Sequence, residues 1–72
     1  MPITNDDLDN WFTYHAPSTE QQYAYRIIRD SARVFALAVL AYTPSSADQT
    51  TAIRKIREAV MTANAAIACR GK

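Results

Sequence analysis

Apolar residues repeat at helical spacing in two long stretches of the chain. In each stretch they step alternately by three and four positions, which is the spacing of one helix face. The two sets are Tyr25, Ile28, Ala32, Phe35, Val39 and Tyr42, and then Ile53, Ile56, Val60, Ala63 and Ile67. The pattern predicts two amphipathic helices that pack against each other along these stripes.

Local signals set the ends of the first predicted helix. Ser18 and Gln21 have the spacing of a capping box, in which each side chain bonds the backbone N–H of the other residue. Pro44 disfavours helical backbone at the residue before it. We therefore expect this helix to run from Ser18 to about Tyr42.

The second predicted helix begins at Ser45 or Ser46 and runs to Cys69, shortly before Gly71. The link between the helices, residues 43–45, is short enough to require an antiparallel hairpin. We expect an all-α fold, with a single helical-hairpin domain over residues 18–70. A short N-terminal segment, residues 1–17, precedes it.

The first helix carries more apolar surface than one neighbouring helix can cover. Its C-terminal half, Val34 to Tyr42, is apolar on every side. In the second helix, small residues that allow close approach of another backbone recur at Ala52, Ala59 and Ala66. These features predict a homo-oligomer with the first helix in the subunit interface. The alternative is a monomer in which Trp11 and Phe12 cover the extra stripe.

The length of the chain also favours association. A domain of 72 residues buries only about 60% of the surface that its unfolded chain exposes. One cysteine and one histidine exclude a disulfide framework and a zinc site. The longest apolar run has nine residues, against about 20 in a membrane span. With no signal segment at the start of the chain, we expect a cytoplasmic protein with no membrane partner.

The formal net charge is only +1, but the charges are unevenly distributed. Residues 1–20 carry acidic residues and no lysine or arginine, whereas residues 21–72 hold all eight basic residues. The net positive charge of residues 21–72 is enough to attract a small anion, but it is too low for a protein that clamps duplex DNA. Both helices are also too long for a helix-turn-helix motif.

The residues that catalysis requires are not assembled in this sequence. There is no nucleophile with a supporting base and acid, no glycine-rich phosphate loop and no metal-ligand cluster. His15 is a conceivable general base, although a lone histidine is more often structural. We expect a binding protein without enzymatic activity, cofactor or metal.

Three arginines of the first helix share one face, because Arg26, Arg29 and Arg33 are spaced i, i+3 and i+7. Guanidinium groups bind phosphate oxygens in a bidentate manner, although such a stripe can also be a solvated surface. Asn64 interrupts an alanine-rich stretch. Because asparagine is a weak helix former, it indicates a specific hydrogen bond to a ligand or across an interface.

Aromatic residues cluster just before the first helix. Tyr14 and His15 could present flat faces to a nucleobase close to the arginines, since stacking and a nearby cation commonly hold small nucleotides. The alternative is that these rings cover the hairpin core.

Several segments resemble a family of small helical-hairpin proteins of tailed phages that sequester cyclic-nucleotide immune signals (anti-CBASS sponges). The resemblance covers nearly all of residues 12–69, and its most specific part is the last segment. The segments are residues 12–17 (FTYHAP), 21–29 (QQYAYRIIR), 44–46 (PSS) with Gln49 and Ala52, and 58–68 (EAVMTANAAIA).

The resemblance implies a homohexamer that binds cyclic dinucleotides such as cyclic GMP–AMP, and in some members cyclic trinucleotides, at subunit interfaces. The ligand stays intact in the host bacterial cytoplasm, so that antiphage signalling is not activated. The resemblance also implies that Tyr14 stacks on a base and that Arg29 or Arg33 meets phosphate. Two alternatives remain open: a sponge for cyclic ADP-ribose-type signals, and a phage protein-protein interaction module.

Overall fold

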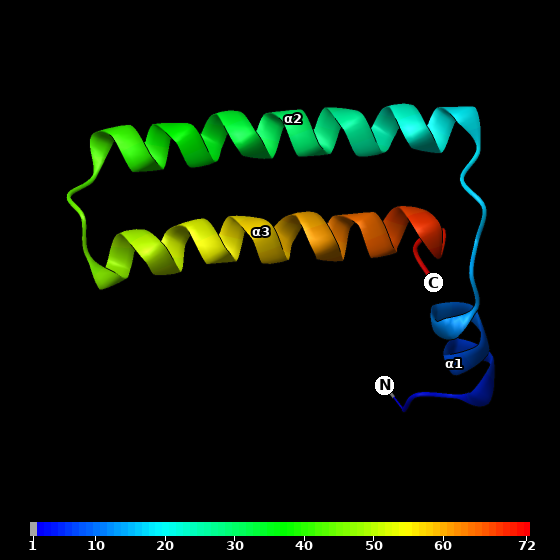
Figure 1. Cartoon of the computed structure of the whole chain (residues 1–72). Coiled ribbons are helices and arrows are strands. Elements are labelled where there is room, and N and C mark those ends of the chain that lie inside the picture. The colour runs from blue at the N-terminus through cyan, green and yellow to red at the C-terminus, as the bar shows by residue number, and fades with distance from the viewer. Residues whose placement is uncertain (1) are drawn as a thin grey trace.

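The computed structural model describes residues 2–72, and in this range it contains three helices and no strand. They are α1 (Asn5–Phe12), α2 (Thr19–Tyr42) and α3 (Ala47–Ala68). Helices α2 and α3 lie side by side and run in opposite directions, while α1 lies beyond the end of this hairpin, next to the C-terminal end of α3 (Figure 1). The predicted all-α hairpin is confirmed.

The predicted capping box begins α2. The Gln21 N–H donates to Ser18 Oγ at 3.1 Å, and the Ser18 N–H donates to Gln21 Oε1 at 3.0 Å. The helix ends at Tyr42, where Thr43 adopts extended backbone before Pro44. Both predicted ends of this helix are therefore confirmed.

Of the two serines that could begin the second hairpin helix, Ser46 is the N-cap, and its Oγ accepts the Gln49 N–H at 3.1 Å. The Gln49 side chain donates to the carbonyls of Leu40 and Thr43 at 3.3 and 3.1 Å, which ties the link to the end of α2. Glutamine at this position therefore closes the hairpin.

The C-terminal end of α3 is also where the sequence predicts it, with Cys69 as the C-cap. Arg70 and Gly71 follow in left-handed conformation, with φ of 56° and 74°. The Gly71 N–H donates to the Ala66 carbonyl at 2.8 Å, which satisfies one of the carbonyls that a helix end leaves free.

Helix α1 was not predicted. Thr4 caps it and forms a capping box with Asp7: the Asp7 N–H donates to Thr4 Oγ1 at 3.2 Å, and the Thr4 N–H to Asp7 Oδ2 at 2.9 Å. Asp7 also lies in the first turn, where a carboxylate stabilises the positive end of the helix dipole. Two local effects thus support a helix too short to form alone in water.

None of the described residues is fully buried in the single chain. The predicted stripe of α3 is half-buried along its whole length, and so is most of the stripe of α2, from Tyr25 to Val39. Phe35 and Tyr42 are the exceptions and remain exposed. The hairpin seam is therefore where the periodicity places it, but one pair of helices cannot close a core.

The extra apolar surface of α2 is uncovered: Val34, Leu37 and Leu40 are 68%, 52% and 57% exposed. Trp11 and Phe12 do not cover it, so the alternative of a monomer closed by these two rings is wrong for this structure. No helix among residues 2–72 is long and apolar enough to cross a membrane.

Candidate functional site

Two of the predicted arginines lie together in a hollow on α2. The hollow, called here the arginine pocket, has a volume of about 520 Å³, within the range of small-molecule sites. It is lined by Thr19, Gln22, Tyr23, Tyr25, Arg26 and Arg29. It thus combines two guanidinium groups with two aromatic rings and two smaller polar side chains.

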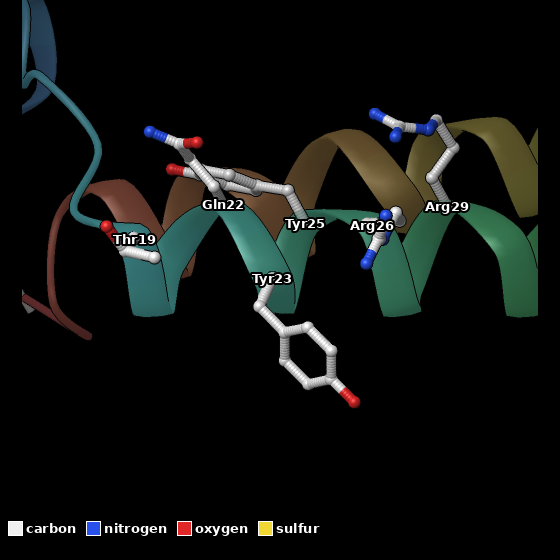
Figure 2. A pocket seen from close by; sticks show the side chains of 6 residues that line it. All are labelled: Thr19, Gln22, Tyr23, Tyr25, Arg26 and Arg29. Atoms are coloured by element: carbon white, nitrogen blue, oxygen red, sulfur yellow. The ribbon is translucent and has the colours of Figure 1, made fainter.

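Helical spacing divides these side chains between neighbouring faces. Gln22, Tyr25 and Arg29 are spaced i, i+3 and i+7, and Figure 2 shows them on the same side of α2. Tyr23 points away on the opposite side, and Arg26 lies between the two. The open side of the hollow leaves both guanidinium groups accessible to a ligand.

The segment that joins α1 to α2, residues 13–18, is called the strap here. It passes the C-terminal end of α3, and a second hollow of about 440 Å³ lies between them. This strap pocket is lined by Asn10, Tyr14, His15, Ala16, Gln21, Ala68, Cys69, Arg70 and Lys72. Tyr14 is 84% exposed there, so its ring is free to stack.

The other predicted strap residue, His15, is engaged by the protein. Its Nε2 lies 2.6 Å from the Asn10 carbonyl oxygen. A carbonyl only accepts, so Nε2 is the donor in this contact, and Nδ1 is the nitrogen left for another partner. The structural role that the sequence left open for His15 is therefore present, and its ring also lines the strap pocket.

The remaining two predicted site residues lie elsewhere. Arg33 lines a shallow apolar hollow that crosses from α2 to α3, together with Arg57 and Met61. Asn64 is half-buried in α3, and its Oδ1 is buried without a hydrogen-bond partner. This unsatisfied oxygen costs about 1–3 kcal/mol, which agrees with a residue kept for a reason other than stability of the single chain.

The structure therefore pairs Arg26 with Arg29, and Tyr14 with His15, in two separate hollows near the N-terminal end of α2. Four further residues with suitable chemistry were not predicted. Tyr23 and Tyr25 lie three and four positions before the two arginines, a spacing that could have placed them beside the guanidinium groups. Nothing in the spacing could place Arg70 and Lys72 beside the strap. The four are Tyr23, Tyr25, Arg70 and Lys72.

The described residues include no group of three His, Cys, Asp or Glu side chains that could hold a metal ion. The Cys69 thiol and His15 Nε2 do not bond each other; both donate to the Asn10 carbonyl, the thiol at 3.8 Å. Aromatic rings, guanidinium groups and amides are the groups that bind an anionic ligand with flat rings.

Comparison with protein families gives a match over most of the chain. The family model described as "Acb2/Tad1, hairpin domain" matches residues 4–68. No curated protein and no solved structure matches the chain. The match spans α1, the strap and both hairpin helices, and therefore all of the arginine pocket. Three residues of the strap pocket, Cys69, Arg70 and Lys72, lie beyond the matched range.

Proposed function

The chain belongs to the Acb2/Tad1 hairpin family, the family of phage anti-CBASS sponge proteins, and from this premise we propose its ligand and its mode of action. It binds cyclic di- or oligonucleotide second messengers, such as cyclic GMP–AMP, in the cytoplasm of the infected host. It holds them intact, without cleaving them, and so withholds them from the host effector. The family match over residues 4–68 is the observation that carries this proposal.

The two hollows supply complementary parts of a nucleotide site. The exposed ring of Tyr14 stacks on a base, and the guanidinium groups of Arg26 and Arg29 bind phosphate oxygens. His15 borders the base through its free Nδ1. Neither Arg33 nor Asn64 lines these two hollows. Both therefore reach the ligand from a second copy of the chain.

A homo-oligomer, with the hexamer as the expected state, completes the site. The single chain has no buried residue in its described part, and six large side chains of α2, among them Val34, Leu37 and Leu40, are more than half exposed. In each copy, residues 18–70 form the hairpin domain that packs through this surface. Residues 1–17 form an N-terminal segment that carries Tyr14 and His15. Stacking and phosphate contacts then come from neighbouring copies.

Thermal unfolding with added nucleotide tests the proposal. A ligand present at a hundred times its dissociation constant stabilises the folded protein by about 2.7 kcal/mol, which raises the melting temperature by several degrees. Cyclic GMP–AMP, a cyclic trinucleotide and cyclic ADP-ribose are compared at equal concentration, with linear AMP as the control. A shift with none of them would refute a sponge and favour a protein-interaction module.

The absence of turnover is tested on the same mixtures. After incubation with excess cyclic GMP–AMP, the protein is removed by heat and the nucleotide is analysed by chromatography. We expect the amount of the intact ring to stay constant over hours. A linear product that increases with time would make the protein an enzyme.

A further inference from the structure

We propose that Asn10 is a positioning residue for Tyr14, because its side chain bonds α1 to the C-terminal end of α3 while its backbone carbonyl accepts a hydrogen bond from the strap. This inference rests on the proposed function, in which Tyr14 contacts the nucleotide. It assigns no contact with the ligand to Asn10 itself. Its role is to fix the backbone from which the Tyr14 ring projects.

The three bonds of Asn10 converge from distant parts of the chain. Its Nδ2 donates to the Cys69 carbonyl at 3.4 Å. Its backbone carbonyl accepts hydrogen bonds from His15 Nε2 at 2.6 Å and from the Cys69 thiol at 3.8 Å. The last turn of α1 is thereby bonded both to the residue that follows Tyr14 and to the C-cap of α3.

Two further side chains anchor the same region. Trp11 Nε1 donates to the Lys72 carbonyl at 3.0 Å, and Gln21 Nε2 donates to the Ile67 carbonyl at 3.1 Å. Ile67 lies in the last turn of α3, where carbonyls lack partners within the helix and are therefore good acceptors, whereas Lys72 follows the helix. The strap is thus held against the end of α3 on both sides, before it at Asn10 and Trp11 and after it at Gln21.

The anchoring matters because Tyr14 is not held by packing. Its side chain is 84% exposed, so its direction depends on the backbone that carries it. A strap that is already ordered loses less conformational freedom when the ligand binds, which raises affinity without any new contact. Loss of the Asn10 side chain should therefore lower the affinity while the tyrosine remains present.

A double-mutant cycle tests the proposal, with affinities for cyclic GMP–AMP measured by calorimetry. We expect Asn10→Ala to lower the affinity up to about tenfold, as for loss of one hydrogen bond, because it removes the bond from Nδ2 to Cys69 and leaves the bonds to the backbone carbonyl in place. Asn10→Asp has the same shape but cannot donate to a carbonyl, so it should be equally weak. Asn5→Ala, at an exposed position of the same helix, is the matched control and should bind like the parent.

The decisive measurement combines these changes with Tyr14→Ala. If Asn10 acts through Tyr14, Asn10→Ala should cause no further loss in the Tyr14→Ala background. Full additivity would overturn the proposal, because it would mean that Asn10 affects binding independently. Trp11→Phe keeps the packing and removes the donor to Lys72, so it provides a second test by the same cycle should Asn10→Ala fold poorly.

A measurement without ligand separates this proposal from the proposed function. Trp11 is the only tryptophan, so its indole N–H gives a single resonance in the proton–nitrogen NMR spectrum. Asn10→Ala should shift this resonance and accelerate its hydrogen exchange, and Asn5→Ala should not. An unchanged resonance would overturn the anchoring alone. Failure of the parent to bind any cyclic nucleotide would instead refute the proposed function, and the positioning role with it.

Discussion

Replacing Leu37 with glutamate should dissociate the proposed oligomer. Leu37 lies on α2 between Val34 and Leu40, and the three side chains are 52%, 68% and 57% exposed in the single chain. Complete burial of such a side chain contributes about 1.5–3 kcal/mol, so covering the exposed half of each contributes about 1 kcal/mol, or about 3 kcal/mol per chain. Val39 is a poorer choice, because it is half-buried in the hairpin seam and its loss would also disturb the monomer.

The glutamate removes the burial energy that Leu37 contributes to association and adds a larger desolvation cost. An unpaired carboxylate in an interface that excludes water costs several kcal/mol. A total loss of about 4 kcal/mol for each interface would weaken association about a thousandfold. Leu37→Met keeps the volume and the apolar character, so it should retain the assembly.

Light scattering coupled to size exclusion measures the mass of the three proteins, and circular dichroism reports whether each is helical. We expect the parent and Leu37→Met to share one oligomeric mass and Leu37→Glu to have a lower mass or reduced helicity. An unchanged mass for Leu37→Glu, or a monomeric parent, would refute the assignment of this surface to an interface.

Three further predictions concern the ligand site and the hairpin. Tyr14→Ala should weaken binding of cyclic GMP–AMP at least tenfold in calorimetry, since stacking is worth about 1–3 kcal/mol per base, whereas Tyr14→Phe keeps most of the affinity. Phe12→Ala is the control, because Phe12 is equally exposed; equal losses for both would remove Tyr14 from the site. Arg29→Ala should lower both the affinity and its dependence on salt concentration, and a salt dependence equal to that of the parent would contradict a phosphate contact. Ser46→Ala should lower the free energy of unfolding by about 1 kcal/mol, because it removes the cap of α3, whereas its neighbour Ser45→Ala should change it little; equal melting temperatures for the two variants would contradict the capping role.

The sequence predicts most accurately those features that depend on residues close together in the chain. Ser18 with Gln21 marks the start of α2, and Cys69 before Gly71 marks the end of α3, because caps act within four residues. Helix α1 has an equivalent signal in Thr4 and Asp7, but its short length gives no clear apolar period beside it.

The site is less predictable because it depends on contacts between distant residues. Helical spacing places Arg26 and Arg29 in one hollow, as expected. The position of Tyr14 depends instead on hydrogen bonds between residues 59 and 61 positions apart, in which Asn10 and Trp11 reach the end of α3. No periodicity reports such bonds, so the sequence could not predict that Tyr14 lies in a different hollow from the arginines.

None of residues 2–72 is fully buried in the single chain, and in the proposed oligomer this would make the melting temperature depend on protein concentration. When folding and association are one reaction, dilution favours the unfolded chain by mass action. Each tenfold dilution then lowers the fraction of chains in the folded oligomer. A nucleotide that bridges two copies, as proposed, would act in the opposite direction, because it would bind the assembled form. The messenger would then promote the assembly of its own trap, and capture would be strongest when the cell contains most of the signal.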